Sequence, residues 1–109
     1  MNTSSEQIKE TKTLLGIREI LRSSRNLLKE KYAVRSLAIF GSYARGDQQA
    51  TSDVDLLVEF EEPIGGFAFI ELADRLEELL GMNVDLLTPE MIKKNLLLKK
   101  SIEENLIHV

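Results

Sequence analysis

Two short apolar runs, separated by a glycine-bearing segment, constrain the fold of this chain more than any other feature. The first run covers residues 37–40 and ends at Gly41; the second covers residues 53–58 and starts with acidic residues. Runs of this length and composition are typical of buried strands. Because side chains alternate along a strand, one face of the second run is acidic at its start and the other is apolar. The acidic face holds Asp53, Asp55, Leu57 and Glu59, and the apolar face holds Val54, Leu56, Val58 and Phe60. We therefore predict two strands joined through a tight turn and a short helix, with both leading aspartates projecting together.

The turn itself is a candidate phosphate site. Gly41 lets the backbone approach a ligand closely, and Ser42 offers an N–H and a hydroxyl to an anion. Arg45 follows three residues later and is expected to stabilise the negative charge of a bound triphosphate. Each of these residues taken alone is more typical of an ordinary turn, helix cap or solvated surface. Their combination with the acids that follow favours a site.

The acids suggest a metal. Asp85 lies in a third strand-like run, residues 82–87, where it alternates with Val84 and Leu86. If this strand neighbours the second one, Asp53, Asp55 and Asp85 converge, and adjacent carboxylates repel unless a cation lies between them. Such a triad suits two Mg²⁺ ions that bind a nucleoside triphosphate and activate an attacking hydroxyl. The pattern predicts nucleotidyl transfer, with one of the carboxylates taking the hydroxyl proton.

The segment from Gly41 to Asp55, together with Asp85, resembles the DNA polymerase β-like nucleotidyltransferase superfamily. Its signature is G-S, a spacer and D-x-D on a strand, followed by a third acid on a later strand. The sequence of residues 37–46 and the short chain length are similar to those of its minimal branch, the MntA-type antitoxins encoded beside HEPN-domain toxins. The likeness covers about residue 17 to the C-terminus, so residues 1–16 are treated as an N-terminal extension and 17–109 as the domain.

The resemblance implies a small mixed β-sheet with flanking helices, an α/β fold. It also implies roles for individual residues: Gly41, Ser42 and Arg45 bind the nucleotide, and Asp53, Asp55 and Asp85 are the catalytic metal ligands. Minimal members of the family use ATP and Mg²⁺ and transfer AMP to a tyrosine of a partner HEPN toxin.

Composition narrows the class of partner. The chain has 109 residues, no cysteine and a formal net charge of −4, which fits one domain in a reducing compartment, so we expect a cytoplasmic protein. Residues 47–90 hold twelve acidic residues and one basic residue, which disfavours a nucleic-acid partner. No apolar stretch is long enough to cross a membrane, and no signal peptide is recognisable. The oligomeric state has no sequence signal.

Helices are predicted to cover the sheet. One amphipathic helix is indicated by three- and four-residue steps among Ile17, Ile20, Leu21, Ser24, Leu27, Leu28 and Tyr32. A second spans residues 69–80 and ends at Gly81, a third starts at Thr88-Pro89, and residues 61–66 form a loop. Residues 96–98 are three consecutive leucines, which one helical stripe cannot bury. We therefore expect one of them to meet solvent or a partner, and irregular packing in the core is the alternative.

The overall prediction is an antitoxin nucleotidyltransferase that transfers AMP from ATP to a tyrosine hydroxyl of a HEPN toxin. One alternative is a non-catalytic antitoxin that neutralises its partner by binding alone. Another is a small-molecule adenylyltransferase, although the chain lacks the additional substrate-binding region that such enzymes carry.

Overall fold

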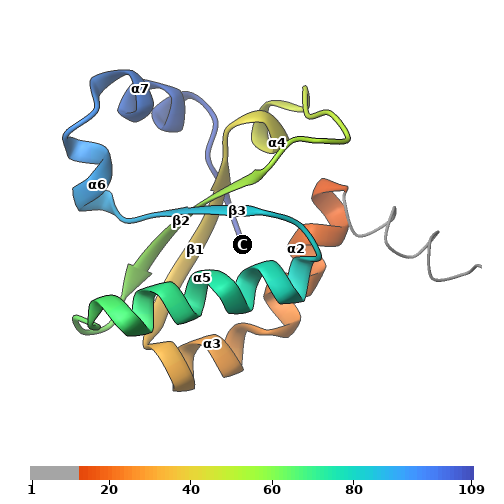
Figure 1. Cartoon of the computed structure of the whole chain (residues 1–109). Coiled ribbons are helices and arrows are strands. Elements are labelled where there is room, and N and C mark those ends of the chain that lie inside the picture. The colour runs from red at the N-terminus through yellow and green to blue at the C-terminus, as the bar shows by residue number, and fades with distance from the viewer. Residues whose placement is uncertain (1–12) are drawn as a thin grey trace, which may run out of the picture.

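The computed structural model describes residues 13–109, which form a mixed four-stranded sheet with helices on both faces (Figure 1). The strands are β1 (Val34–Phe40), β2 (Val54–Phe60), β3 (Val84–Leu87) and β4 (Ile107–His108), in the spatial order β3-β2-β1-β4. β1 pairs antiparallel with β2 and β4, whereas β2 and β3 are parallel. The predicted α/β fold with a small mixed sheet is confirmed.

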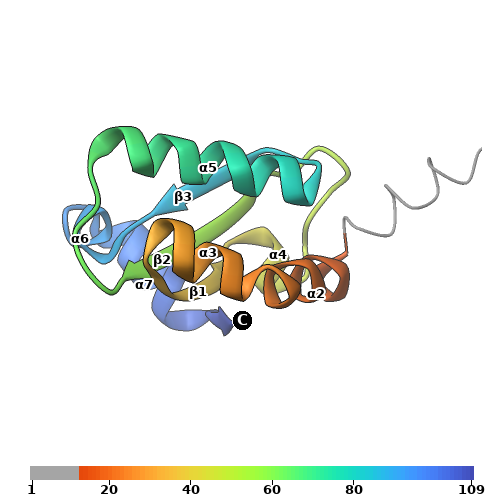
Figure 2. The same cartoon turned by 90° about the horizontal axis from the view of Figure 1, so that it is seen from below.

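Six helices are found within residues 13–109. They are α2 (Leu14–Ser23), α3 (Arg25–Tyr32), α4 (Ser42–Arg45), α5 (Gly66–Leu80), α6 (Pro89–Lys93) and α7 (Leu96–Glu104). Figures 1 and 2 show α2, α3 and α5 side by side on one face of the sheet, while α6 and α7 lie on the other. The crossover from β2 to β3 runs through α5, as a parallel strand pair requires.

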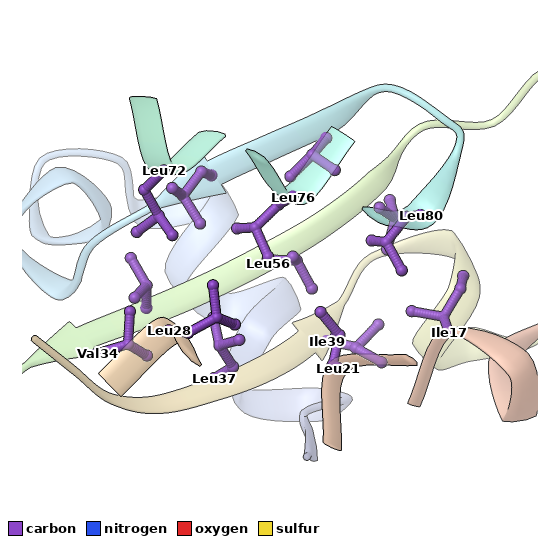
Figure 3. Close-up of a cluster of buried hydrophobic side chains, with 14 of the residues drawn as sticks. Ile17, Leu21, Leu28, Val34, Leu37, Ile39, Leu56, Leu72, Leu76 and Leu80 are labelled. Carbon is purple, nitrogen blue, oxygen red and sulfur yellow. The ribbon is translucent and has the colours of Figure 1, made fainter. Parts of the chain in front are cut away.

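The main core lies between the sheet and the helices α2, α3 and α5. Figure 3 shows leucines of α5 pointing toward Leu56 of β2, and Ile17 and Leu21 of α2 pointing toward Ile39 of β1. Val54, Leu56 and Val58 are fully buried, which confirms the predicted apolar face of the second strand. The opposite face of that strand, with Asp55 and Leu57, is consequently turned toward α6 and α7.

A second, smaller cluster attaches α6 and α7 to this opposite face. Phe40 of β1 packs with Ile92 and Ile102 of the two helices, and Leu57 and Leu98 border the cluster. The predicted start of α6 is confirmed, because the Thr88 hydroxyl accepts a hydrogen bond from the Met91 N–H, with proline at the first helical position.

Two expectations need correction. The single helix predicted over residues 17–32 is two helices: the Ser24 N–H bonds to the carbonyls of Ile20 and Leu21, and a new helix begins at Arg25. The break turns Leu27 outward, 43% exposed, although the stripe predicted it inside. In the leucine run, two side chains rather than one are exposed, and only Leu98 packs inward.

The end of α5 was predicted correctly, but this helix begins at Gly66, three residues before the predicted start, and the loop before it is one residue shorter than predicted. α5 ends at Gly81, whose φ of 67° is the left-handed cap conformation, and residues 61–65 form the loop before it. No helix within residues 13–109 is long and apolar enough to cross a membrane. The proposed N-terminal extension, residues 1–16, falls mostly outside the described part of the chain; its last residues, 14–16, begin α2. The division at residue 17 therefore stays a prediction.

Candidate active site

An open cleft of about 640 Å³ lies at one end of the sheet, on the face that carries α6 and α7. All six residues predicted for the site line it: Gly41, Ser42, Arg45, Asp53, Asp55 and Asp85. The cleft therefore brings together the turn after β1, the start of β2 and the middle of β3, three segments that are distant in sequence.

Strand register places two of the carboxylates side by side. Asp55 is paired with Asp85 in the parallel β2–β3 ladder and with Phe40 in the antiparallel β1–β2 ladder. Both aspartates belong to the face opposite the main core, because their neighbours Val54, Leu56, Val84 and Leu86 are buried in it. Asp53 precedes the first residue of β2 and is exposed. The three acids thus share one cleft, but only Asp55 and Asp85 are strand neighbours.

Gly41 shapes the turn for two separate reasons. Its φ of 74° is a conformation that side-chain-bearing residues rarely adopt. A Cβ built at this position would also overlap the Asp55 Oδ2 atom and crowd its Cγ. Gly41 therefore lets the Asp55 carboxylate lie directly against the backbone of the turn.

The turn is anchored from the core side. Tyr43, the second residue of α4, is only 2% exposed and packs in the main core. The Arg45 N–H bonds to the Gly41 carbonyl at 3.0 Å, and Gly46 ends α4 in the left-handed conformation. The backbone that faces the cleft is consequently fixed by packing and hydrogen bonds.

The surroundings of Asp55 disfavour the ionised form of its carboxyl group. Burial, then the charge and a hydrogen bond of Asp85, and then the charge of Asp53 raise the pKa of Asp55 from its usual 3.8 to about 6. Arg45 acts in the opposite direction and lowers that pKa. A bound cation would relieve the repulsion between these half-buried carboxylates.

Arg45 is held at the rim of the cleft. Its Nε donates to Asp47 Oδ2 at 3.2 Å, and its side chain is 42% exposed. The sequence interpretation did not include Asp47 as a partner. This ion pair is solvent-exposed, so it costs little to open when another anion competes for the guanidinium.

The sequence did not indicate five further residues that line the cleft: Phe40, Ser52, Leu87, Leu98 and Ser101. Phe40 ends β1 directly before Gly41, and Leu87 lies two residues after Asp85 on the same face of β3, so strand alternation could have indicated both. Leu98 and Ser101 belong to α7, and no local pattern links that helix to the site. Their contribution depends on how α7 packs on the sheet.

The donor chemistry of the site suits Mg²⁺, which takes one or two protein carboxylates together with phosphate oxygens and water. Asp55 and Asp85 present such a pair, with Asp53 at the edge of the same cleft. Among residues 13–109, however, no three acidic, histidine or cysteine side chains form a ready-made metal-binding group. The site therefore suits a metal ion that arrives together with the phosphates of a nucleotide. The binding of metal by all three aspartates stays a prediction.

A glycine turn beside strand-borne carboxylates, on a mixed sheet of this order, is the arrangement of a nucleotidyl-transfer fold. Comparison with protein families agrees with that class. The model described as "Nucleotidyltransferase domain" matches residues 17–109, so the chain belongs to this family of enzymes.

Individual relatives are close over nearly their whole length. A candidate protein adenylyltransferase of Methanocaldococcus jannaschii is 54% identical over 98 residues, covering 90% of this chain and 99% of the relative. The protein adenylyltransferase MntA of Thermococcus cleftensis is 40% identical over 97 residues, covering 89% of this chain and 96% of that protein.

Solved structures share the fold. A candidate minimal nucleotidyltransferase superposes with a TM-score of 0.67 at 34% identity, covering 87% of this chain and 94% of that one. A toxin–antitoxin structure with AMP-PNP gives 0.60 at 26% identity, covering 77% and 67%. A tri-AMPylated HEPN toxin of Shewanella oneidensis in complex with an MNT antitoxin gives 0.58 at 20% identity, covering 84% and 70%, a likeness that concerns the fold alone.

Proposed function

We propose that this nucleotidyltransferase is an antitoxin that transfers AMP from ATP to a tyrosine hydroxyl of a partner HEPN toxin, in a Mg²⁺-dependent reaction. The observation that carries the proposal is the meeting of Asp55 and Asp85 beside the Gly41 turn in an open cleft. The names of the relatives support protein adenylylation, and the toxin–antitoxin structure at 26% identity supports a toxin as the partner.

The chain's own groups account for binding and orientation of the nucleotide. Ser42 offers its hydroxyl and N–H to the triphosphate, and Arg45 leaves Asp47 to neutralise phosphate charge that grows as pyrophosphate departs. In the transfer step the acceptor oxygen bonds to the α-phosphorus of ATP, the bond to pyrophosphate breaks, and the hydroxyl proton passes to a cleft carboxylate.

Asp53, Asp55 and Asp85 are the residues that would hold Mg²⁺. When bound, the metal supplies positive charge to the phosphates and lowers the pKa of the attacking hydroxyl. Without it, the acids repel one another and the triphosphate, so the cleft carboxylates alone disfavour ATP.

A folded protein is the acceptor that best fits the cleft. The cleft is open, and within residues 13–109 its lining comes from the sheet, α4, α7 and the connecting segments, which leave a bound small molecule exposed. The acidic middle of the chain also opposes a nucleic-acid strand. An acceptor that brings its own surface and positions its own hydroxyl satisfies both conditions.

Intact-mass spectrometry tests the proposal. The toxin encoded beside this chain is incubated with the protein, ATP and Mg²⁺, and its mass should rise in steps of one AMP. Asp55→Asn, which keeps the shape of the side chain, should remove the mass gain; fragment spectra should place the AMP on tyrosine. If the Asp55→Asn variant neutralises the toxin with no mass change in either sample, the binding-only antitoxin is correct instead.

A further inference from the structure

The outer side of α7 and the segment before it form an exposed surface that the fold does not use. We call Leu96, Leu97, Lys93, Lys94, Lys99 and Lys100 the α7 surface. Leu96 and Leu97 are 80% and 84% exposed. Within residues 13–109 none of the four lysines has a carboxylate within ion-pair distance. Adjacent leucines in water, ringed by unpaired charges of one sign, are typical of a contact surface.

The same helix also builds the cleft. Leu98 and Ser101 of α7 line the cleft, and Ile102 anchors the helix to Phe40. The two exposed leucines precede Leu98 directly in sequence, so the α7 surface begins where the cleft wall ends. A protein that reaches the cleft over α7 would contact this surface.

Charge along the chain distinguishes this surface from the acidic middle of the chain, which provides the three aspartates of the cleft. Residues 91–100 contain four lysines and no acidic residue, whereas residues 47–90 carry twelve acids and one base. Glu103 and Glu104, one turn further along α7, limit the basic area on that side. An acidic protein segment is attracted to the α7 surface and repelled by the acidic middle of the chain.

We propose that the α7 surface docks the acceptor protein through a segment that carries both apolar and acidic side chains. The inference rests on the proposed function, since it names the surface that recognises the acceptor of that reaction. Leu96 and Leu97 supply the apolar contact, and the lysines orient the segment so that its hydroxyl faces the cleft.

The test measures acceptor binding without nucleotide. The protein encoded beside this chain is titrated calorimetrically, in the absence of ATP and Mg²⁺, into the wild type and into the Leu96→Ser/Leu97→Ser and Lys93→Glu/Lys94→Glu variants. Each double variant should raise the Kd for the acceptor at least tenfold. Ile70→Ser on α5, which removes another exposed apolar side chain on the other face of the sheet, should leave the Kd unchanged.

Kinetics then separate docking from catalysis. The leucine variant should raise the KM for the acceptor and leave the KM for ATP unchanged. An unaltered acceptor Kd in the leucine variant overturns the proposal, as does a wild type that fails to bind. A rise in the ATP KM alone in the lysine variant also overturns it, because the lysines would then serve the nucleotide.

The two proposals can fail separately. If the wild type binds through the α7 surface and transfers no AMP, the proposed function falls and the docking surface stands. If AMP is transferred and the variants bind as the wild type does, the docking surface falls and the proposed function stands. Sedimentation of the protein alone provides a further check: a dimer that the leucine variant abolishes would make a second copy the occupant, which overturns the inference.

Discussion

Replacing Asp55 with Asn should stabilise the metal-free protein at neutral pH, although it removes a residue that we place at the centre of the site. The pKa of this carboxyl is raised to about 6, because it is half-buried against Asp85. A rise of roughly two pKa units would correspond to about 3 kcal/mol for a fully buried group. Since Asp55 is partly exposed, solvent screening reduces the expected gain to about 1–2 kcal/mol. For a domain of this size, that is an increase in Tm of roughly 5–10 °C.

The stabilisation by Asp55→Asn should depend on pH, because only the ionised carboxyl group is disfavoured in the folded state. Between the unfolded pKa of 3.8 and the folded pKa of about 6, the native state binds more protons than the unfolded state, so the Asp55 contribution to stability falls as pH rises. Above pH 6 the whole cost of ionising Asp55 is present. The stability difference between the Asn variant and the wild type should therefore be close to zero below about pH 4 and reach its full value near pH 7.

Denaturant unfolding at pH 4 and pH 7.5, with a chelator present, measures this difference. Glu62→Gln is the matched control, because Glu62 is exposed in the loop before α5 and has no ion pair within residues 13–109; it should change stability by less than about 0.5 kcal/mol at either pH. If the Asn variant is no more stable than the wild type at pH 7.5, the inferred repulsion between Asp55 and its neighbouring aspartates is refuted. A gain of the same size at both pH values would refute the role of ionisation.

Three further outcomes are expected. Millimolar Mg²⁺ with ATP should raise the Tm of the wild type by several degrees and that of the Asp55→Asn variant by much less, because a ligand stabilises only the state that binds it; equal shifts in thermal melts would exclude Asp55 as a ligand. Gly41→Ala should lower stability by about 1–3 kcal/mol and abolish transfer, because the positive φ is strained and the new Cβ displaces Asp55; a variant with wild-type activity would show that the turn tolerates a side chain. The double variant Ser42→Ala/Arg45→Ala should raise the apparent KM for ATP, measured by steady-state kinetics, about tenfold or more, with little change in Tm. A large fall in Tm in thermal melts with an unchanged KM would make the turn purely structural.

Much of the site is visible in the sequence because it depends on local backbone geometry. Alternation along residues 54–58 separates a buried apolar face from an acidic one, whatever the strand lies beside. Gly41, Gly81 and Thr88 mark a turn, a helix end and a helix start, since each conformation requires few residue types. These signals depend on the nearest few residues, so periodicity and spacing were sufficient to predict them.

Helix continuity was predicted less well, for a reason that is also physical. The apolar stripe of residues 17–32 continues across Ser24, and nothing in its period shows that the helix stops there and restarts. The break lets both halves pack against α5 and the sheet, with Leu21 and Leu28 both buried. Packing against other elements decided the path of the chain, and the stripe could not show it.

The sequence by itself determined which residues are candidates for the chemistry and which face of each strand they occupy. Only the tertiary structure decided that Asp55 and Asp85 stand at one register position of a parallel pair, that Asp47 holds Arg45 at the rim, and that Leu98 and Ser101 of α7 line the cleft. The reason is that the direction in which a side chain points is set by the backbone of its own strand, whereas its neighbours across a sheet or from a distant helix are set by how the whole chain buries its apolar surface.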